Sequence, residues 1–392
     1  MTEGPNAPRR RICFVATIPF AINVFLRAHI EVLRENYDLV LVANGRAEEV
    51  TVLLDRHVSF IPLKIERSVS FGSDALALVR LWRLFRKGRF DSVHSIMPKA
   101  GFLSMLAARL AGIPRRVHSF TGQVWANQRG LRRWGLKSLD RVLAMNATRL
   151  LADSHSQRQF LIENGVVKVS AIEVLADGSI AGVDVDRFKY DAKARNEIRT
   201  SLRIPDEAIV FIFLGRLNKD KGLVDLCRGF ASAAQELRDI HLMIVGFDDG
   251  AGLDEEFGVL AQRFPGRVHR AGYTEFPEKY LSAADVFCLP SYREGFGSVL
   301  IEAAAVGLPA IASRIYGITD AVEDGVTGIL HEPTADREIA DAMSLLASNS
   351  ALRRRIGDAA RRRAVEKFSE TRVTRAFADF YRGMLSTGRE VT

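Results

Sequence analysis

One stretch of the chain limits its fold more than any other: an apolar run, a glycine-rich turn and a second apolar run between Ala283 and Pro309. The first run, A-A-D-V-F-C-L-P-S, is rich in strand formers and ends at a proline, which is typical of a buried parallel strand. Gly295 and Gly297 then allow backbone conformations closed to other residues, and Ser298 is a candidate cap for the run V-L-I-E-A-A-A-V. The stretch therefore predicts a strand, a tight turn and a helix.

Such a junction has chemistry of its own, because a helix N-terminus presents unpaired N–H groups and the positive end of the helix dipole. A phosphate is the natural ligand there. Glu294 lies in the turn and Glu302 lies one turn inside the helix. Phosphate repels carboxylates, so the two glutamates are better suited to accept hydrogen bonds from hydroxyls. Phosphates with neighbouring hydroxyls describe a nucleotide sugar, although a turn with two solvated glutamates remains the simpler alternative.

Strand-like runs alternate with helical stretches along the rest of the chain, which favours parallel sheets covered by helices on both faces. In folds of this kind, ligands bind at the carboxyl ends of the strands. A helix is expected from about Phe25 to Asn36. The expected strands lie in Arg11–Thr17, Tyr37–Asn44, Val58–Leu63, Asp91–Ile96, Arg115–Ala126, Ala147–Leu161, Ala208–Leu217, His241–Gly246, Val268–Tyr273 and Ala310–Arg314.

Length and composition indicate a globular protein of two or three domains, since the 392 residues are 47% hydrophobic and 26% charged. No apolar run reaches the roughly 20 residues of a membrane-spanning helix, and no secretion signal precedes the first strand. We therefore expect a cytoplasmic protein. The three cysteines, Cys13, Cys227 and Cys288, are far apart in the sequence, which predicts neither a disulfide framework nor a zinc site.

Charge is distributed unevenly along the chain. Residues 1–199 carry 31 lysines and arginines against 19 acidic residues, a net charge of +12, whereas residues 200–392 carry a net charge of −4. This balance favours an anionic partner such as a membrane surface, lipid phosphate or nucleic acid. Ala75–Phe90 and Arg129–Lys137 combine basic and aromatic residues, so each fits either a core-packing helix with a solvated edge or a helix on anionic lipid, with Trp82 and Phe85 at the boundary.

The spacing of Glu294 and Glu302 resembles the E-x7-E signature of the retaining family 4 glycosyltransferases. The resemblance implies the GT-B fold, in which two Rossmann-like, doubly wound α/β domains face each other across a cleft. It also implies that Glu294 faces hydroxyls of the donor sugar and that Glu302 holds the ribose hydroxyls. The backbone of Phe296, Gly297 and Ser298 would meet the diphosphate.

A second motif, G-R-L-x-x-x-K-G, begins at Gly215 and contains Arg216 and Lys221. It resembles the family's diphosphate-binding pair. A fixed arginine and lysine can stabilise the negative charge that develops on a departing nucleoside diphosphate without a metal ion. The resemblance also places the nucleobase at the loop of Gly272 and Tyr273.

The first half of the chain departs from the family pattern in two places. Where relatives commonly have a Gly-Gly turn, this sequence has I-P-F-A-I-N, which leaves Asn23 as a candidate donor contact. Where many have His-Gly or His-Asp, it has Thr121 and Gly122. His118, three residues earlier, fits either a buried strand histidine or an active-site residue, and both remain open.

The segment from Val174 to Phe188 resembles the N-G-V-D-x-x-x-F linker between GT-B domains. Asp184 and Asp186 also match a metal-binding D-x-D pattern, but two aspartates are weak evidence for a metal cage, so we predict no metal and no cofactor. The expected parts are an acceptor-side domain at 1–182, a linker at 183–200, a nucleotide-sugar domain at 201–368 and a helix at 369–392 that crosses back to the first domain.

Together, the motifs, the family resemblance and the charge distribution predict a retaining, metal-independent hexosyl- or N-acetylhexosaminyltransferase at the inner face of the cell membrane. It would use a nucleoside diphosphate sugar, with UDP as the expected nucleotide, and a lipid-linked or surface-polysaccharide acceptor. Two alternatives remain. A nucleotide-sugar epimerase or phosphorylase could share the fold, and a nucleic-acid-binding protein would explain the pI near 9.5. The sequence has no recognised nucleic-acid-binding module, so we expect no nucleic-acid partner.

Overall fold

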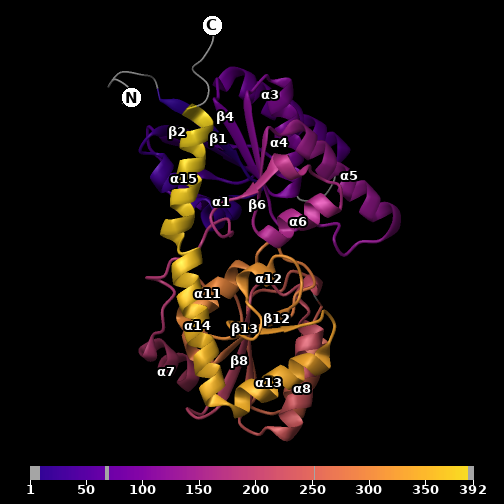
Figure 1. The fold of residues 1–392 in the computed structure, drawn as a ribbon, viewed down its shortest axis with the longest axis vertical. Helices are drawn as coiled ribbons and strands as arrows, with labels where there is room; N and C mark the ends of the chain where they lie inside the picture. The colour runs from indigo at the N-terminus through magenta and orange to yellow at the C-terminus, as the bar shows by residue number, and fades with distance from the viewer. Residues whose placement is uncertain (1–8, 67–69, 251, 387–392) are drawn as a thin grey trace. The chain divides into compact units, whose positions relative to one another are not determined.

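The computed structural model describes residues 9–66, 70–250 and 252–386 of the chain (Figure 1). Two compact units make up the protein. The described parts of 1–181 and 371–392 form unit 1, and residues 182–370 form unit 2, with 251 outside the described part. The chain thus enters unit 2 once and returns to unit 1 for its last helix.

Unit 1 contains a seven-stranded sheet in the order β3-β2-β1-β4-β5-β6-β7, in which every neighbouring pair is parallel. The strand order reverses between β1 and β4. The strands are β1 (Arg10–Val15), β2 (Tyr37–Ala43), β3 (Val58–Pro62), β4 (Ser92–Ile96), β5 (Arg115–Phe120), β6 (Arg149–Ala152) and β7 (Ile172–Val174).

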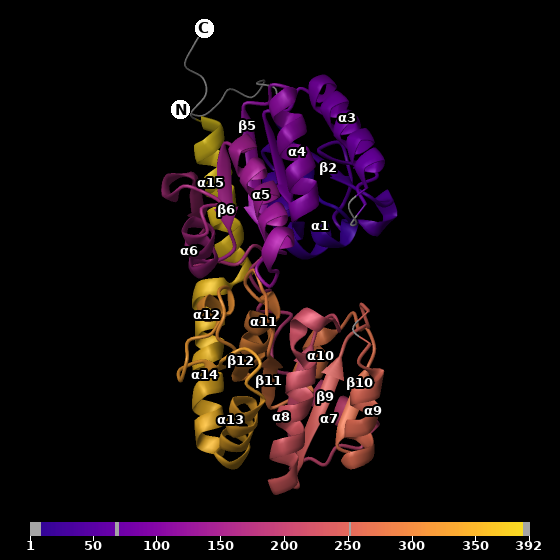
Figure 2. The same cartoon turned by 90° about the vertical axis from the view of Figure 1, so that its right-hand side faces the viewer.

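Helices cover both faces of the unit 1 sheet. On one face, α3 (Phe71–Gly88), α4 (Pro98–Leu110) and α5 (Gly130–Asn146) lie side by side (Figure 2), with α6 (His155–Glu163) next to them. The other face is covered by α1 (Pro19–Phe25), α2 (Arg27–Leu33) and the C-terminal helix α15 (Glu370–Ser386). Each face therefore has its own apolar core.

Aromatic and polar contacts hold α15 against unit 1. The ring of Phe377 stacks on His29 with 4.1 Å between ring centroids, and the Tyr381 hydroxyl lies 2.8 Å from Nδ1 of His94. Burial lowers the pKa of His29 to about 4, so this ring is neutral at physiological pH. A charged ring there would be costly, which suits a helix that docks through an apolar stack.

Unit 2 contains a six-stranded parallel sheet in the order β10-β9-β8-β11-β12-β13. Here the order reverses between β8 and β11. The strands are β8 (Ile209–Leu214), β9 (Ile240–Val245), β10 (Val268–Ala271), β11 (Val286–Leu289), β12 (Ala310–Ser313) and β13 (Gly328–His331). The helices are α7 (Ala192–Ser201), α8 (Leu223–Glu236), α9 (Asp254–Arg263), α10 (Pro277–Ala283), α11 (Ser298–Val306), α12 (Ile318–Ala321), α13 (Asp336–Ser348) and α14 (Ser350–Phe368).

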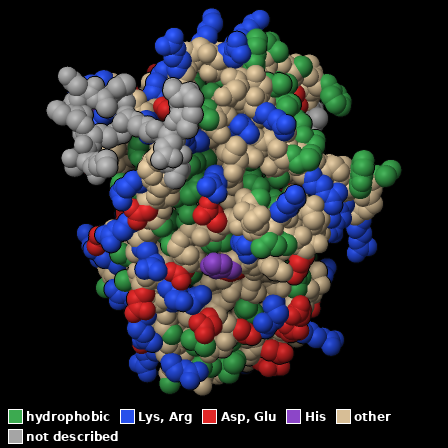
Figure 3. All heavy atoms as spheres, turned by 45° about the horizontal axis from the view of Figure 1, so that its top comes forward, with side chains coloured by type: hydrophobic (Ala, Val, Ile, Leu, Met, Phe, Trp, Pro, Cys, Tyr) green, Lys and Arg blue, Asp and Glu red, His purple; other side chains and the backbone are tan. Residues whose placement is uncertain are grey.

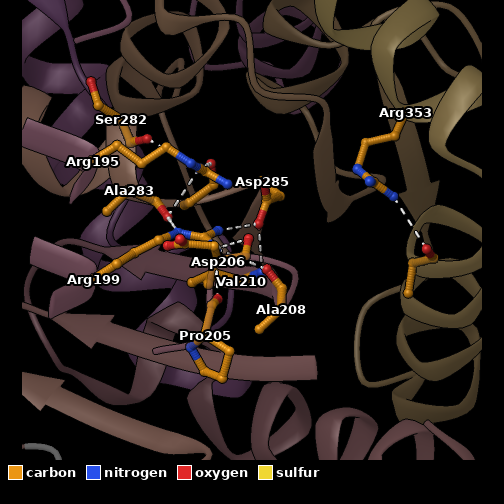
Figure 4. A network of polar contacts seen from close by, with 12 residues as sticks. Arg195, Arg199, Pro205, Asp206, Ala208, Val210, Ser282, Ala283, Asp285 and Arg353 are labelled. Atoms are coloured by element: carbon orange, nitrogen blue, oxygen red, sulfur yellow. Dashed lines mark hydrogen bonds and ion pairs between the residues drawn. The ribbon is translucent and has the colours of Figure 1, made fainter. Parts of the chain in front are cut away.

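An ion-pair network fixes α7 at the amino ends of β8 and β11 (Figure 4). The carboxylate of Asp285 accepts from Arg195 at 2.9 Å, from Arg199 at 2.7 Å and from the N–H of Val210 at 2.8 Å. Arg199 is fully buried and also donates to the backbone carbonyls of Ala283, Pro205, Asp206 and Ala208. A buried charge with this many partners is satisfied only in the folded unit.

The two parallel, doubly wound sheets confirm the predicted fold class. Two local predictions were wrong. The segment I-P-F-A-I-N, which stands where relatives commonly have a Gly-Gly turn, is not a loop: from Pro19 onward it belongs to helix α1, and proline in the first turn of a helix loses no hydrogen bond. The cap of α11 is Gly297 in a left-handed conformation rather than Ser298. Of the two interpretations left open for Ala75–Phe90, the core-packing one holds at Phe85, which is 1% exposed and packs against Phe90 in the core.

Candidate active site

Two loops of unit 2 meet where the strand order reverses, between β8 and β11. One loop carries Gly215, Arg216 and a single 3-10 turn, η3 (Lys219–Lys221), and the other runs from Pro290 to Gly297. Both loops follow the carboxyl ends of their strands. In doubly wound sheets this position is the preferred place for a ligand.

The charged groups of the two loops are in direct contact. Nζ of Lys221 lies 2.5 Å from Oε1 of Glu294, and the side chains are 17% and 13% exposed. The same oxygen accepts from the hydroxyl of Ser291, a fully buried residue, at 2.8 Å. Within the described residues, the second oxygen of Glu294 has no hydrogen-bond partner. The carboxylate is therefore held by one oxygen and can accept a further hydroxyl with the other.

Arg216 lies close to this pair in sequence but is more open to solvent. Its side chain is 49% exposed, and the guanidinium binds the carboxylate of Asp249 at 2.9 Å. The preceding Gly215 has φ +153°, and its carbonyl contacts Gly246 so closely that a Cβ on Gly246 would lie 1.8 Å from the oxygen. Glycine is thus required where the loops after β8 and β9 pass each other.

Helix α11 begins directly after the glutamate loop. Gly297, its N-terminal flanking residue, has φ +76° and no side chain to cap the first N–H groups. Ser298 is the first helical residue. Phe296 is 2% exposed and packs edge to face on Phe368, with 5.1 Å between ring centroids. The buried phenyl ring fixes the loop, so that the backbone N–H groups of the first turn keep one position for an anion.

Glu302 lies inside α11 and is half-buried. Within the described residues its carboxylate has no hydrogen bond and no ion pair. Burial raises the pKa of Glu302 to about 7, Arg187 opposes this shift, and Glu278 adds to it. An acceptor that is desolvated yet unpartnered is suited to a ligand with hydroxyl groups.

Exposed aromatic rings follow β9 and β10. Phe247 is 42% exposed and Tyr273 is 62% exposed, and their rings meet at an angle of 66° with 6.3 Å between centroids. Gly272 lies between β10 and Tyr273 with open space around its Cα. These rings offer a stacking surface for a flat heterocycle at the same edge of the sheet.

Comparisons with known proteins agree with this geometry. The family described as "Glycosyl transferases group 1" matches residues 194–363, and the "Glycosyl transferase 4-like domain" matches residues 21–178. Together the two families match most of the chain. This chain is a family 4-type glycosyltransferase.

Several relatives act in bacterial glycan synthesis, according to their names. The capsular polysaccharide biosynthesis glycosyltransferase CapM of Staphylococcus aureus is 27% identical over 377 residues, covering 96% of this chain and 98% of CapM. A UDP-Gal:alpha-D-GlcNAc-diphosphoundecaprenol alpha-1,3-galactosyltransferase of Escherichia coli is 28% identical over 307 residues, which cover 76% of this chain and 77% of the relative. The structure of Anabaena HepE, in complex with UDP and glucose, matches this structure with a TM-score of 0.79 at 19% sequence identity. The match covers 96% of this chain and 100% of HepE.

These matches favour the glycosyltransferase over the epimerase and the nucleic-acid-binding alternatives. By their names, two of the relatives that this chain resembles act in capsular polysaccharide synthesis and on a diphosphoundecaprenol-linked sugar. The fold shared with HepE extends over nearly the whole of both chains, so it includes both units.

The candidate residues in unit 1 of the glycosyltransferase are engaged in internal contacts. His118 is 1% exposed, its Nδ1 lies 2.9 Å from the Ser95 hydroxyl, and burial lowers its pKa to about 3. This favours the buried strand histidine over a residue that contacts substrate. The Asn23 amide donates to the Glu49 carbonyl at 2.8 Å and accepts from the Thr51 N–H at 2.9 Å, so it ties a loop to α1.

Thr121 follows β5 and is half-buried. Its carbonyl accepts from the side-chain amides of Gln123 at 2.8 Å and Gln157 at 3.0 Å. These bonds fix the backbone of Thr121. A role of its hydroxyl at the active site stays a proposal. The structure therefore brings Lys221 and Glu294 of unit 2 into contact, whereas Asn23 and His118 are held by neighbours within unit 1.

The aspartates of the D-x-D pattern have a local role. Oδ1 of Asp184 accepts from the N–H groups of Asp186 and Arg187, each at 3.1 Å, as in a turn cap. In the described part of the chain, no group of three or more histidine, cysteine, aspartate or glutamate side chains could hold a metal ion.

Sequence reasoning missed three residues at this site: Ser291, Phe247 and Asp249. Ser291 follows the proline that ends a strand-like run, which marks it as the first residue of a loop. Phe247 follows the glycine that ends another such run. Polar and aromatic residues directly after parallel strands could have been collected as a set, because all such positions share one edge of the sheet.

Proposed function

We propose that this glycosyltransferase is a retaining, metal-independent hexosyl- or N-acetylhexosaminyltransferase. It moves a sugar from a nucleoside diphosphate donor to a lipid-linked or surface-polysaccharide acceptor. One observation carries the proposal: Lys221 and Glu294, from the loops of two different strands, meet in the turn that leads into α11. A cation, a hydroxyl-binding carboxylate and a helix N-terminus are what a sugar diphosphate requires.

In the proposed reaction, the bond between the anomeric carbon and the diphosphate oxygen breaks, and a bond to the acceptor oxygen forms on the same face of the sugar. The acceptor proton passes to the departing diphosphate. Lys221 and Arg216 stabilise the charge that grows on the leaving group, together with the N–H groups of Gly297 and Ser298. Glu294 orients the sugar through its unpartnered oxygen, and no protein nucleophile is needed.

The nucleotide is proposed to be UDP. The name of the Escherichia coli relative gives a UDP sugar as its donor, and the Anabaena structure holds UDP and glucose. In this chain, Tyr273 and Phe247 would stack on the base beside Gly272, and Glu302 would accept hydrogen bonds from the ribose hydroxyls.

A transfer assay with a panel of UDP sugars and an undecaprenyl-diphosphate sugar acceptor, run in EDTA, tests the proposed function. The expected product has the same anomeric configuration as the donor, which proton NMR reports directly. An inverted product would contradict the retaining mechanism, and a strict requirement for a divalent metal would contradict metal independence.

Donor binding should depend on pH through Glu302. Because its pKa is about 7, the carboxylate is protonated below pH 7 and accepts the ribose hydroxyls less well. The donor KM is expected to rise as the pH falls, by up to about tenfold per unit below 7. Glu302→Gln should show a higher KM at pH 8 and little change with pH. A wild-type profile that is flat from pH 8 to pH 5.5 would contradict the ribose role.

The carboxyl of Glu302 also affects folding stability, which is expected to fall as the pH rises, whereas donor binding is expected to improve. The folded-state pKa of Glu302 lies above its usual value of 4.5, so the folded protein binds this proton more tightly than the unfolded chain. Stability is therefore lost as the pH rises from about 4.5 to 7. Glu302→Gln is expected to be more stable than the wild type above pH 7, although it is expected to bind the donor less well.

Unit 1 is proposed to meet the acceptor at an anionic membrane surface. Exposed apolar side chains of α3 and α5 stand among arginines and lysines: Phe71 is 90% exposed, Leu131 87% and Trp134 67%. In the upper part of Figure 3, exposed hydrophobic side chains lie beside groups of lysine and arginine side chains. Among the described residues, no helix is long and apolar enough to span a bilayer. A surface of this kind suits peripheral binding at the inner face of the membrane.

Sedimentation with vesicles of phosphatidylcholine and phosphatidylglycerol tests the membrane proposal. Replacing both Leu131 and Trp134 with serine should lower vesicle binding about tenfold or more, because two apolar side chains no longer enter the interface. Val259→Ser is the matched control, since Val259 is a 61% exposed apolar residue of unit 2. Equal binding by all three proteins would contradict the proposal.

A further inference from the structure

We propose that Tyr292 and Asp225 form a clamp that positions Lys221 for the diphosphate. The inference rests on the proposed function of the unit 2 site and assigns to it two positioning residues that do not themselves contact the substrate. It follows from how the loop after β11 is joined to the loop after β8.

The backbones of the two loops are in contact. The N–H of Tyr292 donates to the carbonyl of Asp220 at 2.8 Å, directly before Lys221. Directly after it, Gly222 has φ +65° and lies so close to Pro290 that a Cβ would stand 2.0 Å from the proline carbonyl oxygen. Lys221 is therefore flanked on both sides by contacts with the partner loop.

Side chains add a second layer of contacts. The Tyr292 hydroxyl donates to Oδ2 of Asp225 at 2.6 Å, and Asp225 lies in the first turn of α8 and is 6% exposed. Burial and this carboxylate raise the pKa of Tyr292 above its usual range, so the hydroxyl keeps its proton. Arg293 binds the carboxylate of Asp220 at 2.7 Å. The short, buried bond between Tyr292 and Asp225 is the better shielded of the two links.

The segment that carries Lys221 needs such support. It is one 3-10 turn of three residues, capped by the side chain of Asn218, and too short to hold its own conformation. Lys221 has a long side chain, and its ammonium contacts only the Glu294 carboxylate among the described residues. Small shifts of the turn would move the cation away from the position where leaving-group charge develops, and misplacement of that size is costly in catalysis.

The contacts between the two loops also bind the carboxylates of two acidic residues near Lys221. Asp220 directly precedes Lys221 and Asp225 lies in the next turn of the chain, and unpaired carboxylates near the lysine would weaken its attraction for a diphosphate. Arg293 neutralises the first, and the Tyr292 hydroxyl binds the second. Loss of the tyrosine hydroxyl would thus leave a buried acid without its donor and release the loop that carries Lys221.

A double-mutant cycle tests the clamp. Tyr292→Phe, Lys221→Ala and the double variant are compared for affinity to UDP, ADP and GDP in EDTA by calorimetry, and for turnover of the UDP sugar that the wild type accepts. Tyr292→Phe alone should lower turnover about tenfold, the effect of losing a charge-assisted hydrogen bond. In the Lys221→Ala background the same change should have little further effect, because the residue on which the clamp acts is absent.

Two further variants separate positioning from folding. Asp225→Asn keeps an acceptor oxygen for Tyr292 and should lose less turnover than Tyr292→Phe. Tyr190→Phe, at an exposed tyrosine of unit 2, should behave as the wild type. A Tyr292→Phe effect of equal size in both backgrounds would overturn the clamp and leave the proposed function intact. Failure of the wild type to bind any nucleoside diphosphate would overturn the proposed function, and the clamp with it.

Discussion

Replacing Lys221 with alanine is expected to lower the turnover of the nucleotide-sugar donor by about 10²-fold or more. The reason is electrostatic: the side chain of Lys221 is 17% exposed and its ammonium lies 2.5 Å from Glu294, so the charge acts in a partly desolvated site. Its loss removes charge stabilisation from the departing diphosphate and leaves Glu294 without its cation. Arg216→Ala is expected to have an effect of similar size, because the proposed mechanism has Arg216 exchange Asp249 for the diphosphate in the transition state.

Steady-state kinetics with and without acceptor measures this effect. Lys219→Ala is the matched control, because Lys219 belongs to the same 3-10 turn and is exposed. The control should remain within about twofold of the wild type. Unchanged turnover in both Lys221→Ala and Arg216→Ala would show that the reaction takes place at another site.

Replacing Arg199 with methionine is expected to lower the free energy of unfolding of unit 2 by about 3–5 kcal/mol. The guanidinium is fully buried and binds Asp285 at 2.7 Å together with four backbone carbonyls (Figure 4). Methionine fills a similar volume, but the carbonyls and part of the Asp285 carboxylate lose their donors.

Urea unfolding followed by circular dichroism measures the loss. Lys193→Met serves as the control, since Lys193 lies in the same helix with its side chain 85% exposed. The network lies at the amino ends of β8 and β11, away from the loops that carry Lys221 and Glu294. An equal shift of the unfolding midpoint in both variants would contradict a special role for the buried network.

The sequence was most informative where local chemistry decides the structure. The strand that ends at Pro290, the turn at Gly297 and the positions of Arg216 and Lys221 after β8 follow from apolar runs closed by proline or glycine. Parallel strands buried on both faces have few alternatives, and their carboxyl ends share one edge of the sheet. The loops of the proposed donor side could therefore be predicted from the sequence alone.

Long-range contacts explain what could not be predicted. Asn23 has the chemistry of a ligand contact, but its amide bonds to the backbone at Glu49 and Thr51, more than 25 residues away. His118 is buried because Gly101 of α4 leaves room for its ring: a Cβ at Gly101 would lie 2.4 Å from it. Neither partner is visible in a local pattern. The clamp of Tyr292 on Asp225 joins residues 67 apart and is likewise a property of the fold.

The central claim is that the loops after β8 and β11 form a nucleoside diphosphate site. Calorimetric titration of the wild type and of Glu302→Ala with UDP, ADP and GDP in EDTA tests it most directly. The wild type is expected to bind UDP at one site, and Glu302→Ala is expected to bind it at least about tenfold more weakly, because the ribose hydroxyl groups lose a charged acceptor. Binding of none of the three diphosphates by the wild type, or equal UDP affinity in both proteins, would contradict it.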